Sequence, residues 1–131
     1  MKEKTRFEYG LELEREGWKW LQKERPALIF LDRNVRYRMG EVDLVYLDPL
    51  DGPKGTVVFC EVRTRKGEAK VEDEAFDPEA FLGLQKIRRL RRASFAFLLS
   101  WRGRPKLGAR EVRYDLLLKR GSRWCIFEDI F

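Results

Sequence analysis

Apolar positions recur along the chain at spacings that predict two helices and five strands. Residues 4–24 carry apolar side chains three and four positions apart, which is typical of an amphipathic helix, and Pro26 ends the segment. Residues 77–79 (Asp-Pro-Glu) supply an N-cap, a proline and an acidic first turn, so a second helix is expected from residue 78 to about 101. Short apolar runs predict strands at residues 27–31, 41–48, 56–65, 112–118 and 124–127.

The order of these elements, α-β-β-β-α-β-β, predicts an α/β fold with a mixed central sheet and a short C-terminal strand. With 131 residues the chain is expected to form a single domain over 1–131. Charged residues follow Met1 and no apolar run is long enough to span a bilayer, so we expect a cytoplasmic protein. The acidic, glycine-containing stretch at 67–76 is expected to be a mobile loop, and Cys60 and Cys125 are expected to be reduced thiols.

Two of the predicted strands carry charged residues at alternating positions. Glu41 and Asp43 lie two residues apart in one strand, and Glu61 and Arg63 lie two residues apart in the next. Because a strand repeats every two residues, each pair is expected on one face, and pairing of the strands would bring all four together. Buried charges of this kind need a bound cation, a mutual ion pair or access to solvent. We expect a divalent metal site.

Charge and composition narrow the chemistry. The chain has 28 Lys and Arg against 22 Asp and Glu, a net charge of +6, which favours an anionic partner. Histidine is absent, which excludes histidine-based nucleophiles and general bases and most catalytic zinc sites, and there is no glycine-rich phosphate loop. The groups that remain available for catalysis are carboxylates, Lys or Arg side chains and a bound metal. A basic block without acidic residues comprises Lys86, Arg88, Arg89, Arg91, Arg92, Arg102, Arg104 and Lys106.

Several motifs together resemble a known family. Gly40-Glu41-Val42-Asp43-Leu44 and Phe59-Cys60-Glu61-Val62-Arg63 are the most specific of them. The flanking positions that fit are Gly10, Glu14, Gly17, Trp20, Leu21, Arg33, Asn34, Lys86, Arg88, Arg89, Leu90, Ala93, Arg113, Tyr114, Asp115, Ile130 and Phe131. With these residues the chain resembles the bacterial YraN family of the restriction-endonuclease-like PD-(D/E)XK superfamily, which is similar to archaeal Holliday-junction resolvases.

The resemblance implies a restriction-endonuclease-like core and a metal-dependent active site. Asp43 and Glu61 would hold Mg²⁺ or Mn²⁺, Glu41 is a further candidate ligand, and Glu14 would reach the metal through water. The catalytic residues implied are therefore Asp43, Glu61, Arg63 and Glu14. Nucleic acid, in the first place DNA, is the expected partner, and similarity to junction resolvases implies a homodimer. The nucleic-acid-binding residues expected are Lys86, Arg38, Arg65 and Arg89.

Two departures from the family pattern bear on this interpretation. The segment from Asp48 to Gly55 is longer than expected, and the lysine of the E-x-K element is Arg63. An arginine stays charged, so it cannot act as a base, although it can bind phosphate in a bidentate way and stabilise developing negative charge.

Each candidate residue also has a purely structural interpretation. Glu61 can pair with Arg63 or Arg38, and Glu41 can pair with Arg36 or Arg38. Glu14 and Lys86 can be solvated helix residues, and the four tryptophans are expected to be core or interface residues rather than base-stacking platforms.

The leading hypothesis is a metal-dependent nuclease-like protein that binds DNA, branched or single-stranded, and hydrolyses phosphodiester bonds. One alternative is a nucleic-acid-binding module that keeps the fold without catalysis. Another is a protein-interaction module that uses the basic helix.

Overall fold

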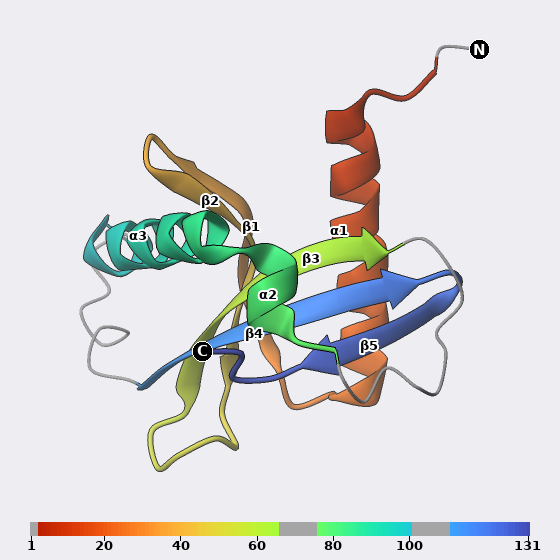
Figure 1. Ribbon diagram of the computed structural model, residues 1–131. Coiled ribbons are helices and arrows are strands. Elements are labelled where there is room, and N and C mark those ends of the chain that lie inside the picture. Colours follow the sequence, from red (N-terminus) through yellow and green to blue (C-terminus); the bar gives the residue numbers. More distant parts are fainter. Residues whose placement is uncertain (1–2, 66–75, 101–110) are drawn as a thin grey trace.

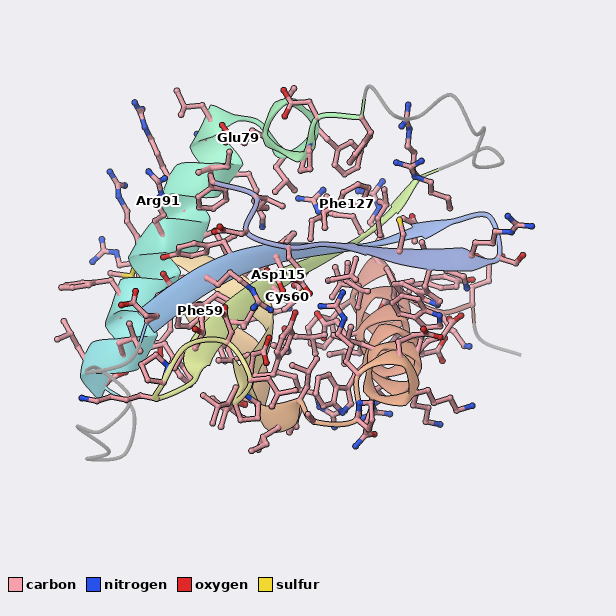
Figure 2. All side chains as sticks on the ribbon, turned by 90° about the horizontal axis from the view of Figure 1, so that it is seen from below. Phe59, Cys60, Glu79, Arg91, Asp115 and Phe127 are labelled. Atoms are coloured by element: carbon pink, nitrogen blue, oxygen red, sulfur yellow. The ribbon has the colours of Figure 1, made fainter. Side chains whose placement is uncertain are left out.

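The computed structural model describes residues 3–65, 76–100 and 111–131. Its elements are α1 (Arg6–Glu24), β1 (Ile29–Tyr37), β2 (Gly40–Asp48), β3 (Thr56–Arg65), α2 (Pro78–Leu82), α3 (Leu84–Ser100), β4 (Glu111–Arg120) and β5 (Arg123–Phe127). A single sheet of five strands forms the centre of the molecule (Figure 1). Helix α1 lies on one face of this sheet, and α2 and α3 lie on the other (Figure 2).

The sheet is mixed, as the order of elements predicts. Its strands follow the order β1-β2-β3-β4-β5, and every neighbouring pair is antiparallel except β3 and β4, which are parallel. A parallel pair needs a long crossover connection, and here α2 and α3 lie within that connection. The predicted α/β class is therefore confirmed.

Two elements differ most from the prediction. Strand β1 continues to Tyr37 instead of ending near residue 31, because a register shift between Phe30 and Asp32 and the positive φ of Asn34 (50°) let it pass through a polar stretch. The second helix is interrupted at Gly83, whose φ of 85° is in the left-handed region that favours glycine. The predicted mobile loop lies almost wholly outside the described residues, as does the end of the basic block at 102–106.

Helix α1 approaches the sheet closely at Gly17. A Cβ atom there would lie 2.8 Å from Leu117 Cδ2 and 2.9 Å from the Trp124 ring, so any larger residue would require these side chains to shift. Leu21 is fully buried beside Tyr46 in the cluster on this face. The close contact holds the preceding helical turn, which carries Glu14, over the sheet.

Helix α3 packs on the opposite face through Leu90, Ala93 and Phe97, which form one cluster with residues of β2 and β3. Gly40, at the start of β2, allows the backbone of α3 to come close. A Cβ atom there would lie 2.5 Å from the carbonyl oxygen of Arg89. This contact brings the N-terminal half of α3 next to the turn between β1 and β2.

A buried network of hydrogen bonds links β2, β4 and the C-terminal tail. Arg113 donates from Nε and Nη2 to both oxygens of Asp115, a fully buried residue near the middle of the view in Figure 2. Asp115 also accepts from the Tyr46 hydroxyl at 2.8 Å and from the Asp129 backbone N–H at 3.0 Å. The network therefore ties the C-terminal tail to the sheet.

Cys60 and Cys125 are both reduced thiols outside any disulfide, as expected. The three tryptophans within the described residues, Trp18, Trp20 and Trp124, pack partly buried against the core, which confirms the structural interpretation for them. Among the residues that the structure describes, no helix is long and apolar enough to cross a membrane.

Candidate functional site

The backbone pairing between β2 and β3 ends beside Asp43. The last pair in register is Leu44 with Cys60, and beyond it the Asp43 carboxylate replaces the missing backbone partner by accepting from the Val62 N–H at 2.9 Å. Strand β2 is irregular here, because Val42 and Val45 both pack in the cluster under α3 although three positions separate them. A local opening between two central strands thus places the Asp43 carboxylate next to Glu61.

Glu61 is the most deeply buried carboxylate of the site. Its side chain is 3% exposed, and its Oε1 atom lies 2.9 Å from Arg63 Nε and 3.4 Å from Lys86 Nζ. The other oxygen, Oε2, is buried and has no hydrogen-bond partner within the described part of the chain. One oxygen of this carboxylate is therefore left unsatisfied by the described residues.

Glu14 brings a third carboxyl group to the same place from α1. The residue is 6% exposed, and its side chain lies close enough to Asp43 for a hydrogen bond when one of the two carboxyl groups holds a proton. Its Oε2 atom is also buried, with no hydrogen-bond partner among residues 3–65, 76–100 and 111–131. The interpretation of Glu14 as a solvated helix residue is therefore wrong.

Burial and mutual repulsion make these carboxyl groups hard to ionise. Desolvation, with smaller contributions from the Glu14 side chain, raises the pKa of Asp43 to about 7. Desolvation and the Asp43 charge raise the pKa of Glu61 to about 7, against the attraction of Lys86 and Arg63. Desolvation also raises the pKa of Glu14. A group of repelling carboxylates that holds protons near neutral pH gains stability from a cation that replaces those protons.

The number of side chains that could act as ligands limits which metal ion would fit. Among the described residues, no three Asp, Glu, Cys or His side chains converge as ligands of one ion. Mg²⁺ is typically held by one or two carboxylates and keeps several waters, so it does not need a larger set. Asp43 and Glu61 meet that requirement, and the buried Glu61 Oε2 atom is the observation that favours a bound cation.

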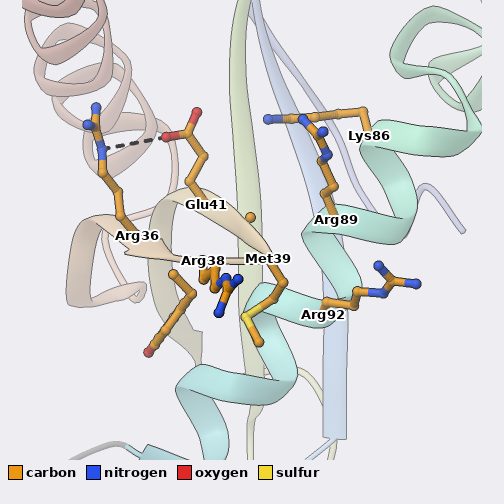
Figure 3. A pocket seen from close by; sticks show the side chains of 9 residues that line it. Arg36, Arg38, Met39, Glu41, Lys86, Arg89 and Arg92 are labelled. Atoms are coloured by element: carbon orange, nitrogen blue, oxygen red, sulfur yellow. Dashed lines mark ion pairs between the residues drawn. The ribbon is translucent and has the colours of Figure 1, made fainter.

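A cationic cleft lies beside the carboxylates, between the β1–β2 turn and α3. It has a volume of about 460 Å³, and five of its lining residues are the cations Arg36, Arg38, Lys86, Arg89 and Arg92. In Figure 3 the three cations of α3 lie opposite the hairpin that carries Arg36, Arg38 and Glu41. Lys86 belongs to both features, because it lines the cleft and reaches Glu61.

The structure brings the predicted site residues to the carboxylates or to the cleft, except Arg65. Glu41 lines the cleft in an ion pair with Arg36 at 3.5 Å, which is one of the structural interpretations considered for it (Figure 3). Arg65 lies at the end of β3, where its guanidinium is 5.4 Å from the centre of the Phe76 ring. The contribution of Arg92 to the cleft was not anticipated, although the three-residue spacing of Lys86, Arg89 and Arg92 on one helix face would have indicated it.

Comparisons with known proteins agree with the resemblance seen in the sequence. The model of a family described as "Uncharacterised protein family UPF0102" matches residues 13–118. A UPF0102 protein of Corynebacterium glutamicum is 40% identical over 87 residues, 66% of this chain and 58% of the relative. A UPF0102 protein of Burkholderia pseudomallei is 35% identical over 108 residues, 82% of this chain and 65% of the relative. The matches thus span less than two thirds of the length of these curated relatives. The chain belongs to the UPF0102 family, which is the YraN family.

Proposed function

We propose that this protein is a metal-dependent nuclease-like domain that binds DNA and hydrolyses phosphodiester bonds. The observation that carries the proposal is the position of the half-buried Asp43 and the buried Glu61, on adjacent strands beside a cleft lined by five cations. Carboxylates that repel one another are costly to bury, and a divalent cation is the partner that relieves the cost and also attracts phosphate. The restriction-endonuclease-like core remains part of the proposal, supported by the mixed sheet and the acidic positions on β2 and β3.

The side chains have distinct roles in this proposal. A bound Mg²⁺ or Mn²⁺ ion supplies Lewis acidity and a water of lowered pKa. Asp43 and Glu61 hold that ion, and the Val62 N–H keeps Asp43 in place. Lys86 and Arg63, which both reach Glu61, neutralise the phosphate that enters the site. Glu14 accepts or returns a proton beside Asp43.

The cleft supports nucleic acid as the ligand. Its cations follow one edge of the site, where they can contact successive phosphates, and the whole chain carries a net charge of +6. Binding that depends on such contacts weakens as salt concentration rises. Arg38 and Arg89 line the cleft, so they contribute to affinity more than to the chemical step.

The direct test is cleavage of plasmid, single-stranded and four-way-junction DNA by the pure protein with Mg²⁺ or Mn²⁺. Asp43→Asn and Glu61→Gln should each remove activity and keep DNA binding, because they change charge with little change in volume. Glu16→Gln is the matched control, since Glu16 is an exposed carboxylate of α1 that pairs with Lys119 of β4, away from the proposed site. Equal cleavage by all three variants would refute the assignment.

One observation favours a second candidate, a DNA-binding module without turnover. Arg63 replaces the lysine of the family element and holds Glu61 Oε1 at 2.9 Å, so an internal ion pair already satisfies half of the carboxylate. Calorimetry with Mn²⁺ separates the two candidates. If the protein is a nuclease, it should bind Mn²⁺, and Glu61→Gln should abolish that binding. If it is a binding module, it should show salt-dependent affinity for DNA and no binding of Mn²⁺.

A further inference from the structure

A second cavity lies on the other side of Glu14, between α1 and the first two strands. Its volume is about 230 Å³, and it is lined by Trp18 and Phe30, by the cations Arg15, Lys19 and Arg33, and by Glu14 itself. None of the roles proposed for the metal site uses this cavity. Glu14 is the link, because its carboxyl group lies beside Asp43 and also lines the cavity.

Phe30 gives the cavity an exposed aromatic surface. Phe30 is 43% exposed. The centre of its ring lies 5.5 Å from the centre of the Trp18 ring, and the two ring planes are tilted by 55°. Trp18 in turn packs against Tyr46 at 5.6 Å, so it is fixed by the core. An exposed aromatic ring held by a rigid neighbour is suited to stack with a planar heterocycle.

Polar groups around the rings match the other parts of a nucleotide. The cations Arg15, Lys19 and Arg33 are exposed at the rim, where they can meet phosphates on either side of a stacked base. Glu14 is more than nine-tenths buried, and its Oε2 atom has no hydrogen-bond partner in the portion of the chain that the structure describes. A nucleobase that donates an N–H to this oxygen would satisfy it.

We propose that this cavity receives one unpaired nucleobase of the DNA, next to the phosphate at Asp43 and Glu61. The inference rests on the proposed function and adds a substrate class to it. The preferred substrate is then DNA with an unpaired nucleotide at the site, as in a bulge or a single-stranded segment, rather than a continuous duplex. Stacking on Phe30 supplies the preference, and Glu14 orients the base.

Binding without metal tests the proposal independently of cleavage. We would measure affinities in EDTA for a duplex with one bulged 2-aminopurine and for the fully paired duplex of the same flanking sequence. The wild type should bind the bulged duplex about tenfold more tightly, the size expected for one stacked base. The 2-aminopurine emission should fall on binding, since stacking quenches it.

Two variants of one residue identify the contact. Phe30→Ala should remove the tenfold preference and the quenching, and Phe30→Leu, which keeps an apolar side chain in the fold, should do the same. Tyr9→Ala, at an exposed aromatic residue that lies on α1 and does not line the cavity, is the control and should change neither. Equal affinity for the two duplexes, or a preference that survives Phe30→Leu, would overturn the proposal.

The outcomes separate this inference from the proposed function. A bulge preference without cleavage in Mg²⁺ or Mn²⁺ supports the cavity and refutes the nuclease. Cleavage of paired and bulged duplexes at the same rate, with equal affinity, supports the nuclease and refutes the cavity. Failure to bind any of these DNAs at low salt refutes both.

Discussion

Glu61→Gln should make the protein more stable at alkaline pH while it removes metal binding. Glu61 has an ordinary pKa of 4.5, and burial beside Asp43 raises its pKa to about 7. A carboxyl group with a raised pKa contributes its full stability below pH 4.5, and that contribution is lost as pH rises through about 7. The wild type without metal should therefore become less stable between about pH 5 and pH 8.5.

The size of the effect follows from the pKa. At about 1.4 kcal/mol for each tenfold change in proton affinity, ionising Glu61 in the folded protein costs about 3 kcal/mol. The Asp43 charge acts on Glu61 and the two groups titrate as a coupled pair, so we expect a measured gain of about 1 to 3 kcal/mol for the variant at pH 8.5. At about pH 5 the wild-type group is already protonated, and the difference should nearly vanish.

Urea unfolding at the two pH values, in EDTA, measures this difference. Glu16→Gln is the control with the opposite sign. Its ion pair with Lys119 lowers the pKa of Glu16, so the control variant should gain no stability as pH rises. Adding Mn²⁺ at pH 8.5 should stabilise the wild type and leave Glu61→Gln unchanged. If the wild type is equally stable at both pH values, the inference that ionised Glu61 destabilises the folded protein is wrong.

Three further substitutions test the packing and the buried polar network of the fold. Gly40→Ala should destabilise the fold by about 1 to 3 kcal/mol in urea, because the new Cβ would meet the Arg89 carbonyl oxygen. Gly10→Ala, where a Cβ meets no atom within 4 Å in the described structure, should instead stabilise α1 by about 0.5 to 1 kcal/mol. Arg113→Met should cost about 3 to 5 kcal/mol, because it leaves the buried Asp115 carboxylate without its bidentate partner. An Arg113→Met midpoint equal to that of the wild type would show that the network contributes nothing.

Much of the fold follows from local sequence signals. The alternation of apolar residues placed β2 and β3 within a residue of their observed bounds, and Asp77 acts as the predicted cap by accepting from the Glu79 N–H at 3.0 Å. Strand β1 was predicted too short because residues 32–36 are mostly polar, and an edge strand does not require an apolar sequence. The interruption at Gly83 depends on a backbone conformation that a single glycine permits but does not require.

The part of the candidate site that depends on strand periodicity was predictable from the sequence. The motifs and the expected pairing of β2 with β3 brought Asp43 and Glu61 together. The alternation of residues did not predict the hydrogen bond from the Val62 N–H to Asp43, because this bond forms where the backbone pairing between β2 and β3 ends. The burial of Glu14 depends on the close approach at Gly17, and the position of Lys86 depends on the approach at Gly40. Contacts between distant elements decide both, and no local pattern encodes them.

A comparison of two buried acidic positions of the sheet supports the proposed ligand. Asp115 is fully buried, and both of its oxygens accept hydrogen bonds, from Arg113, Tyr46 and the Asp129 N–H. Glu61 is almost as buried on the neighbouring strand, yet its Oε2 atom has no partner among the residues described. The fold can therefore satisfy a carboxylate completely where only structure is needed. It leaves Glu61 incompletely satisfied beside a cationic cleft, and a cation that arrives with its phosphate would supply what the protein itself does not.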